Sequence, residues 1–202
     1  MQADVPPLIL ASASVARRAV LAAAGLRFAV RPAAIDEAAV KHAARSQGID
    51  AIAAALRLAD AKADRVARLE PQALVIGADQ ILDCDGTWHD KPEDLAAARR
   101  QLLALRGRPH VLATAVVCRT GDRLLWQHVA QPRLTMRKFS EPFLDAYLAA
   151  EGELVLSSVG AYRLEGLGVQ LFTSVDGDHA TILGLPLLPL LEFLRSAGVV
   201  LA

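Results

Sequence analysis

The chain has 202 residues, of which 53% are hydrophobic and 22% are charged, a composition that supports a folded domain with a sizeable core and excludes global disorder. Its 22 basic and 22 acidic residues give a formal net charge of zero, which argues against a general nucleic-acid-binding protein and requires any anion site to be local. Two cysteines, Cys84 and Cys118, are too few for a disulfide scaffold or a cysteine-rich zinc site, so we expect buried thiols and a cytoplasmic protein.

The N-terminal residues permit two interpretations. The apolar residues 8–10, followed by the small residues 11–13, resemble the end of a signal peptide. The leader 1–7, however, contains Asp4 and neither lysine nor arginine, and the apolar run is short, so we expect a chain that is not exported. No apolar run reaches the ~20 residues needed to cross a bilayer. The strongest, 182–191, is short and contains Pro186 and Pro189.

In the first half of the chain, the pattern of apolar residues predicts strands alternating with helices. We expect strands over 8–11, 28–31 and 74–77, and helices over 16–24 and 49–69, which end at Gly25 and before Pro71. A loop after the second strand carries residues 36 and 37. The continuous apolar run 74–77 predicts a central strand with both faces covered, and Asp79 then projects from its carboxyl end.

The second half of the chain adds hairpins to this alternation. We expect strands over 81–83 and 87–89 around an Asp-Gly turn, followed by a helix from Pro92 to about 105. Two long strands over 111–118 and 124–134 and a helix from 140 to about 152 come next. A glycine-punctuated loop over 153–168, a strand over 169–175 and a helix over 187–196 complete the chain. Helices and strands in both hairpin and crossover arrangements predict an α/β fold with a mixed sheet.

The junction between the first predicted strand and the first predicted helix is a candidate anion site. Ser12 and Ser14 lie at this junction, and Arg17 and Arg18 fall in the first turn of the helix. Cations oppose the positive end of the helix dipole there, whereas a bound anion reverses that effect. Helix amides, two hydroxyls and an arginine fork together form a phosphate-binding site. The alternative is an ordinary serine cap with two solvated arginines, and the junction alone leaves both open.

Acidic and basic side chains are expected to gather near the third strand. Asp79 lies at an edge where α/β sheets bind ligands, and Asp36 and Glu37 are placed to meet it. Converging carboxylates hold Mg²⁺ or Mn²⁺, which polarises a phosphoryl oxygen and orients in-line attack. Lys62 and Lys91 are placed to neutralise charge on a transferring phosphoryl group. For each residue alone a structural role is the alternative, as a turn cap or as a solvated or snorkelling lysine.

These residues belong to ordered motifs that resemble those of the Maf family of nucleotide pyrophosphatases, once described as septum-formation inhibitors. The similarity runs almost from end to end. The matching elements are LASASVARR over 10–18, IDE over 35–37, KA over 62–63, VIGAD over 75–79, KP over 91–92, LRGRPHVLAT over 105–114 and GLP over 184–186. Each element is weak alone, but their shared order makes the resemblance specific.

The resemblance implies a single Maf-like domain over 1–202, with a mixed, strongly twisted sheet flanked by helices and two lobes around a central cleft. It also implies a metal-dependent enzyme that cleaves nucleoside triphosphates between the α- and β-phosphates, giving a nucleoside monophosphate and pyrophosphate. Asp79 is then the catalytic base, and Asp79 and Glu37 bind Mg²⁺ or Mn²⁺. The implied catalytic residues are Asp79, Lys91 and Glu37, and the implied substrate-binding residues are Ser12, Ser14, Arg17, Lys62 and Lys91.

Three positions bear on the base of the nucleotide. The branch of the family that acts on dTTP and UTP has Thr after the aspartate and a later I-Q-G, whereas the branch that acts on 7-methyl-GTP has D-Q and E-G-x-G. This chain has Gln80 and Glu165-Gly-Leu-Gly and is similar to the second branch. A carboxylate at 165 accepts hydrogen bonds from guanine N1–H and the 2-amino group, and favours a positively charged methylated base. Ala16 stands where that branch tends to carry a tryptophan able to stack on such a base.

The expected function is therefore removal of modified purine nucleotides, with 7-methyl-GTP as the expected substrate. The expected partner is a nucleoside triphosphate and neither a nucleic acid nor a membrane, and a homodimer is left open. One alternative is a non-catalytic nucleotide-binding regulator of septum formation, which would need the triphosphate site but not the acids and lysines. The other is a pyrophosphatase that prefers dTTP or UTP, against which Gln80 and Glu165 count.

Overall fold

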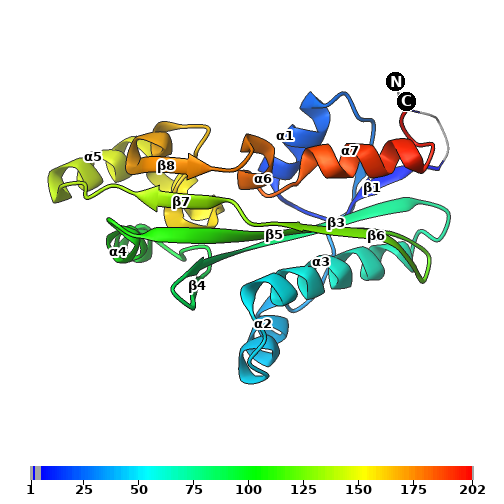
Figure 1. Ribbon diagram of the computed structural model, residues 1–202, viewed down its shortest axis with the longest axis horizontal. Coiled ribbons are helices and arrows are strands. Elements are labelled where there is room, and N and C mark those ends of the chain that lie inside the picture. Colours follow the sequence, from blue (N-terminus) through cyan, green and yellow to red (C-terminus); the bar gives the residue numbers. More distant parts are fainter. Residues whose placement is uncertain (1, 3–5, 202) are drawn as a thin grey trace. The chain divides into compact units, whose positions relative to one another are not determined.

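The computed structural model describes Gln2 and residues 6–201, so most of the leader considered above, including Asp4, lies outside the described residues. The described chain folds into a mixed α/β structure (Figure 1). Its strands are β1 (Leu8–Leu10), β2 (Ala29–Val30), β3 (Leu74–Cys84), β4 (Thr87–His89), β5 (Pro109–Thr120), β6 (Arg123–Ala130), β7 (Arg133–Met136) and β8 (Phe172–Asp176). They follow the order β2-β1-β3-β5-β7-β8, with β4 paired to β3 and β6 paired to β5.

The helices lie between these strands. They are α1 (Val15–Ala23), α2 (Glu37–Ser46), α3 (Ala51–Ala67), α4 (Leu95–Leu105), α5 (Glu141–Glu151), α6 (His179–Ile182) and α7 (Leu187–Ser196), with short 3₁₀ helices η1 (Gly152–Ser157), η2 (Val159–Ala161) and η3 (Leu167–Leu171). None of the helices in the described part of the chain is both long and apolar enough to span a membrane.

The chain forms two compact units, as the two-lobed prediction requires. The first unit comprises Met1–Gln80, Thr114–Ala130 and Asp178–Ala202, and the second comprises Ile81–Ala113 and Gln131–Gly177. The long strands β3 and β5 each contribute residues to both units. The prediction of a mixed α/β fold is confirmed.

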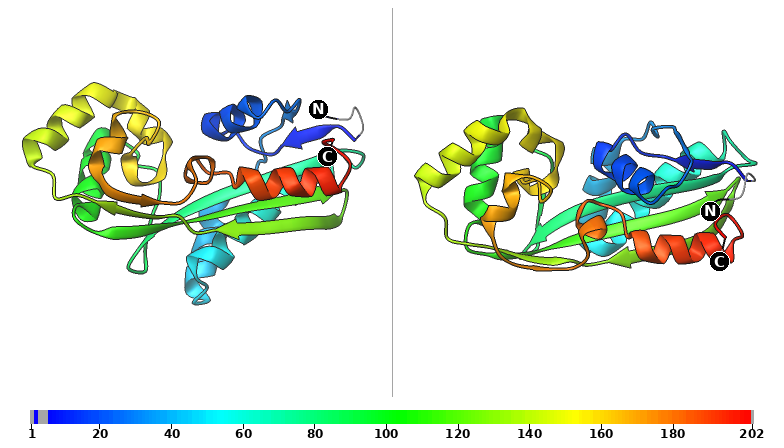
Figure 2. Two further views of the ribbon diagram at one scale, coloured as in Figure 1. Left: turned by 45° about the horizontal axis from the view of Figure 1, so that its top comes forward. Right: turned by 90° about the horizontal axis from the view of Figure 1, so that it is seen from above.

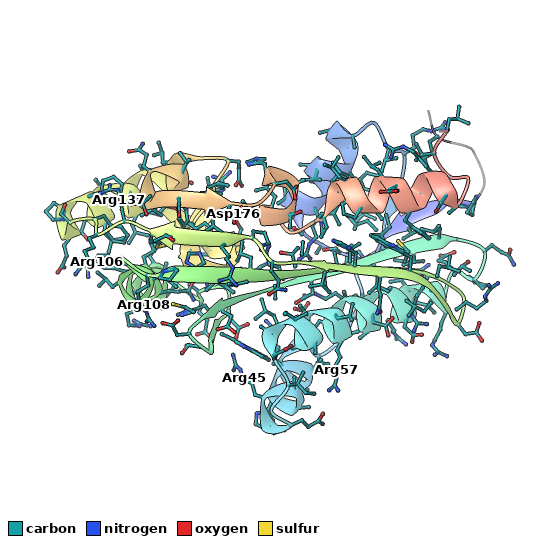
Figure 3. All side chains as sticks on the ribbon, in the orientation of Figure 1. Arg45, Arg57, Arg106, Arg108, Arg137 and Asp176 are labelled. Atoms are coloured by element: carbon teal, nitrogen blue, oxygen red, sulfur yellow. The ribbon has the colours of Figure 1, made fainter. Side chains whose placement is uncertain are left out.

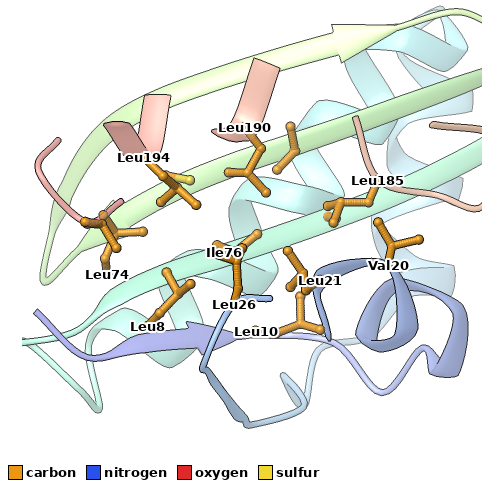
Figure 4. Packing of buried hydrophobic residues seen from close by; sticks show 14 residues of the cluster. Leu8, Leu10, Val20, Leu21, Leu26, Leu74, Ile76, Leu185, Leu190 and Leu194 are labelled. Carbon is orange, nitrogen blue, oxygen red and sulfur yellow. The ribbon is translucent and has the colours of Figure 1, made fainter. Parts of the chain in front are cut away.

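The first unit is built on β3, whose buried residues confirm the prediction of a central strand. β1 pairs in parallel with β2 on one side and with β3 on the other, and the part of β5 that belongs to this unit pairs antiparallel with β6. Helices α1 and α7 cover one face, where their leucines meet those of the strands (Figure 4). The labelled core residues are Leu8, Leu10, Val20, Leu21, Leu26, Leu74, Ile76, Leu185, Leu190 and Leu194.

Helix α3 covers the other face of the first unit (Figure 2). Its alanine-rich sequence lets it approach β3 closely, because alanine adds little volume between helix and strand. The closest approach is at Gly77, where a Cβ atom would lie 2.2 Å from the Ala59 carbonyl oxygen and 2.8 Å from Ala63 Cβ. Only glycine fits at position 77. This contact lies two residues before Asp79 and therefore positions α3 beside that carboxylate.

The second unit consists of hairpins, α4, α5 and the short 3₁₀ helices. The Asp85-Gly86 turn between β3 and β4 is confirmed, and both turn residues have the positive φ that this hairpin turn requires. Three arginine side chains, labelled in Figure 3, join its segments. Arg106 donates to the carbonyl of Phe139, Arg108 to the carboxylate of Asp85, and Arg137 to the carbonyl of Gln170. Cys84 of this unit and Cys118 of the first unit are both buried, as predicted.

Several predicted boundaries were wrong. Asp79 does not project from the end of a strand, because β3 continues to Cys84 as one arm of the β3–β4 hairpin. The strand predicted over 124–134 is two strands, β6 and β7, separated at Pro132, which has no N–H to donate to a sheet. Helix α4 begins at Leu95 rather than Pro92, because Asp94 caps it by accepting from the Ala97 N–H.

Two helices were not predicted. The segment carrying Glu37 is not only a loop, because Asp36 accepts from the Ala39 N–H and starts α2. Similarly, Asp178 accepts from the Thr181 N–H and starts the single turn of α6. The segment predicted as a loop over 153–168 contains 3₁₀ turns, and the strand predicted from 169 begins at Phe172. The prediction for 187–196 is confirmed by α7.

Candidate active site

A buried ion cluster joins three segments of the first unit. Lys62 lies in α3, and its Nζ is 2.6 Å from Asp79 Oδ1 on β3 and 2.8 Å from Glu37 Oε1 at the start of α2. The Asp79 side chain is 6% exposed and that of Glu37 is 48% exposed, so the cluster reaches solvent through Glu37. One ammonium therefore contacts two carboxylates, whose oxygen atoms are the kind of ligand that a divalent cation uses.

The Glu37 carboxylate is kept ionised by its surroundings. Burial alone would raise the pKa of Glu37, but the hydrogen bond to Lys62 and the positive charges nearby, Arg17 among them, hold this pKa below its ordinary value. Glu37 therefore stays negatively charged at neutral pH and is available as an oxygen ligand.

The second oxygen of Asp79 is the least satisfied atom of the cluster. Asp79 Oδ2 is buried and has no hydrogen-bond partner. Such an atom is costly unless a ligand or a proton satisfies it. Mg²⁺ sites that act on phosphates use one or two carboxylates and leave the other positions to water and substrate. Glu37 and Asp79 fit that requirement, whereas no group of three or more His, Cys, Asp or Glu side chains among the described residues forms a closed metal site.

The N-terminus of α1 is organised by Ser14, Ser12 and Arg17. Ser14 caps the helix by accepting from the Arg17 N–H at 3.3 Å, and its own N–H donates to Ser12 Oγ at 3.2 Å. Arg17 donates through Nη1 to Ser12 Oγ at 3.3 Å and through Nε to the Gly184 carbonyl at 2.8 Å. Ser14 is thus a helix cap, as the structural alternative proposed, but Arg17 is held in place rather than solvated. Arg18 is exposed.

The helix terminus and the ion cluster interact electrostatically. Burial lowers the pKa of the Arg17 guanidinium, and the negative charges of Asp79 and Glu37 act against that shift. Arg17 therefore lies within the field of both carboxylates. The structure brings together the predicted residues of the first unit, which are Ser12, Ser14, Arg17, Glu37, Lys62 and Asp79.

Gln80, a predicted specificity residue, is engaged inside the first unit. Its Nε2 lies 2.8 Å from Thr114 Oγ1 and 3.2 Å from each of the carbonyl oxygens of Thr181 and Ile182. These contacts connect β3 with β5 and with α6. Gln80 therefore supports the segment that leads to Gly184, and its role in selecting a base stays a prediction.

The remaining three predicted site residues are Ala16, Lys91 and Glu165. Ala16 is half-buried near the start of α1. Lys91 and Glu165 belong to the second unit, where Lys91 is exposed between β4 and α4 and Glu165 is exposed before η3. The catalytic and substrate-binding role of Lys91 and the specificity roles of Ala16 and Glu165 stay predictions.

Sequence reasoning missed two features that organise these residues. One is the steric role of Gly77, which the alanines at 59 and 63, four residues apart on one helix face, indicate only once strand and helix are paired. The other is Glu151 at the carboxyl end of α5. A negative charge is unfavourable at that end of a helix, so its presence there was the available indication.

The fold and the site together define the class of this protein: it is an α/β protein with a candidate anion site at a helix N-terminus, in the electrostatic field of a pair of carboxylates. A family model described as "Maf-like protein" matches residues 7–197, and the chain belongs to this family. The predicted family is confirmed.

Similar proteins cover almost the whole chain. The "Nucleoside triphosphate pyrophosphatase" of Granulibacter bethesdensis is 55% identical over 188 residues, which cover 93% of this chain and 95% of that protein. The protein of the same name from Rhodospirillum rubrum is 50% identical over 202 residues, covering 100% of both chains. The "7-methyl-GTP pyrophosphatase" of Rhizobium meliloti is 48% identical over 195 residues, covering 96% of this chain and 98% of that protein.

Proposed function

We propose that this chain hydrolyses nucleoside triphosphates between the α- and β-phosphates, giving a nucleoside monophosphate and pyrophosphate. The observation that carries this function is the buried cluster of Lys62, Asp79 and Glu37, with the unpartnered Asp79 Oδ2, in the field of Arg17. The names of relatives that are 48% to 55% identical support the same reaction.

In this proposal the triphosphate binds at the N-terminus of α1. The helix terminus and the hydroxyls of Ser12 and Ser14 favour an anion there. Arg17 is already oriented by Ser12 and Gly184, so little conformational entropy is lost when its other N–H groups meet a phosphate. Lys62 offsets the negative charge that develops on the transferring phosphoryl group.

Asp79 is the general base. Asp79 Oδ2 accepts a proton from a water molecule whose oxygen attacks the α-phosphorus, the bond from that phosphorus to the bridging oxygen breaks, and pyrophosphate leaves. The hydrogen bond of Asp79 Oδ1 to Lys62 fixes the orientation of the carboxylate during this step. Glu37 and Asp79 are the residues that would hold a Mg²⁺ or Mn²⁺ ion, which would supply Lewis-acid polarisation of a phosphoryl oxygen when bound.

We further propose a guanine-type substrate, with 7-methyl-GTP as the leading candidate. Glu165 supplies an exposed carboxylate, which accepts hydrogen bonds from guanine N1–H and the 2-amino group. One of the relatives named above bears the name 7-methyl-GTP pyrophosphatase, which supports this substrate. Ala16, in contrast, offers no ring for stacking on the methylated base. A comparison of 7-methyl-GTP with GTP therefore tests the effect of Ala16.

The test is pyrophosphate release with Mg²⁺ or Mn²⁺ from 7-methyl-GTP, GTP, dTTP, UTP and a deaminated purine triphosphate. Asp79→Asn should lower turnover by about 10²- to 10⁴-fold, the usual contribution of a general base. Asp83→Asn is the matched control, because Asp83 lies on the same strand and accepts from the turn N–H of Gly86 rather than from Lys62. It should retain wild-type turnover.

Each result of the panel decides between the alternatives. Fastest hydrolysis of 7-methyl-GTP supports both the reaction and the proposed base. Fastest hydrolysis of dTTP or UTP supports the reaction and refutes the guanine assignment. Nucleotide binding without any metal-dependent pyrophosphate release refutes the enzyme and favours a nucleotide-binding regulator.

A further inference from the structure

A buried carboxylate, Glu151, holds the segment that carries Glu165. Glu151 is the last residue of α5, and its side chain is 6% exposed. Burial and the negative end of the helix dipole both disfavour its charge. Two donors compensate: Glu151 Oε1 accepts from the Leu167 N–H at 2.8 Å, and Oε2 accepts from Arg163 Nη1 at 2.9 Å. The carboxylate therefore binds both ends of the segment 163–167.

Two glycines, Gly166 within this segment and Gly168 one residue beyond it, lie where the same packing leaves little room for a Cβ atom. A Cβ at Gly166 would lie 2.6 Å from Glu151 Oε1. A Cβ at Gly168 would lie 2.4 Å from the Arg163 carbonyl oxygen and 2.7 Å from its backbone nitrogen. The chain is thus folded tightly around Glu151 and Arg163, and this explains physically why glycines flank position 167.

Arg163 connects the buried carboxylate to the exposed one. Its Nη1 donates to Glu151, and its Nε donates to Glu165 Oε1 at 3.3 Å. Burial lowers the pKa of the Arg163 guanidinium, but the Glu151 and Glu165 carboxylates outweigh this effect and raise it above its usual value. The Glu165 side chain remains 36% exposed, and the apolar side chains of Leu167 and Val169, two and four residues later in the chain, are also exposed. This segment therefore presents both a hydrogen-bond acceptor and apolar side chains to solvent, the two kinds of group that a purine base requires.

We propose that Arg163, held by Glu151, is the positioning residue that orients the Glu165 carboxylate toward a guanine-type base. The proposal rests on the function proposed above. Arg163 occupies one oxygen of Glu165 and restricts the rotation of that side chain, so the carboxylate is oriented before the nucleotide arrives. Glu151 acts one step further back, by fixing Arg163.

A double-mutant cycle tests this order of action. The measured quantity is the ratio of kcat/KM for GTP to kcat/KM for dTTP, together with the ratio of the association constants (1/Kd) of the α,β-methylene analogues, again GTP to dTTP. Arg163→Gln should lower both ratios by about tenfold, the value of one well-placed charge-assisted hydrogen bond. In a Glu165→Gln background the same substitution should have no further effect, because Arg163 acts through Glu165.

Two further variants keep the test independent of folding. Glu151→Gln retains an acceptor for the Leu167 N–H but loses the ion pair with Arg163, and it should lower the ratios in the same direction. Arg99→Gln is the matched control, because Arg99 also bridges two carboxylates of the second unit, Glu141 and Asp145. It should leave both ratios at the wild-type value.

The results separate this proposal from the proposed function. Unchanged or raised ratios in Arg163→Gln refute the positioning role, and so does a full additional effect in the Glu165→Gln background. Absence of pyrophosphate release from the wild-type chain refutes the enzyme alone, because the Kd ratios of the analogues still test Arg163.

Discussion

Replacing Gly77 by alanine tests whether the approach of α3 to β3 sets the geometry of the ion cluster. The new Cβ would lie 2.2 Å from the Ala59 carbonyl oxygen and 2.8 Å from Ala63 Cβ. Because non-bonded heavy atoms rest at about 3.5 Å, α3 has to move away from β3 by about 1 Å. Lys62 moves with the helix, so its distance to Asp79, now 2.6 Å, rises beyond the ~3.2 Å limit of a normal hydrogen bond.

We expect Gly77→Ala to lower the free energy of unfolding by about 1–3 kcal/mol, the usual cost of overpacking. For a chain of this size the Tm then falls by about 2–12 °C. The kcat/KM for pyrophosphate release should fall by about 100-fold, because a displacement of ~1 Å misaligns the catalytic groups. Thermal melting followed by circular dichroism and the pyrophosphate assay measure the two effects.

The matched control is Gly121→Ala at the turn between β5 and β6. Gly121 has a φ of +53°, so alanine there costs about 1–2 kcal/mol of backbone strain. No heavy atom lies within the clashing distance that Gly77 shows, and α3 has no reason to move. Gly121→Ala should therefore lose stability and keep its activity. Wild-type turnover by Gly77→Ala, or an equal loss of activity in both variants, would refute the reasoning.

Three further predictions follow from the site. The pKa of Glu37 in the folded chain lies below its ordinary value of 4.5. The charge of Glu37 therefore stabilises the folded state above pH 4.5, and this stabilisation is lost as the pH falls below 4.5. The Tm difference between wild type and Glu37→Gln, followed from pH 7 to pH 3, should therefore shrink on acidification, and a gap that widens contradicts this. Lys62→Gln removes the ammonium that contacts both Asp79 and Glu37, so urea titration should show a loss of about 3–5 kcal/mol and the pyrophosphate assay a loss of turnover. Ser14→Ala removes the cap of α1 and should cost about 1 kcal/mol in the same titration, whereas Ser14→Asp, which keeps a cap, should cost less.

Local chemistry made parts of the fold predictable. The serine cap of α1, the Asp-Gly hairpin turn and the apolar run at the start of β3 each depend on residues close together in the sequence. The start of α2 was missed although Asp36 is also a local cap, because the residues that follow are mostly alanine or charged, with Val40 as the one large aliphatic side chain of the helix.

The assembly of the site depends on contacts between distant segments. Lys62, Glu37 and Asp79 come from α3, α2 and β3, and no spacing in the sequence shows that one ammonium lies between two carboxylates. Their joint role could be predicted only from the resemblance of their motifs to a known family. The steric need for Gly77 was also hidden, because it depends on how closely α3 packs.

The contact between Arg17 and Gly184 links the order of synthesis to the acquisition of function. The carbonyl that orients Arg17 lies 167 positions later in the chain, within the last of the three segments that form the first unit. During translation Arg17 therefore emerges long before the atom that holds it. The phosphate-binding arrangement at α1 is complete only when Asp178–Ala202 has joined the unit, so an unfinished chain lacks a finished site in which to hold a triphosphate.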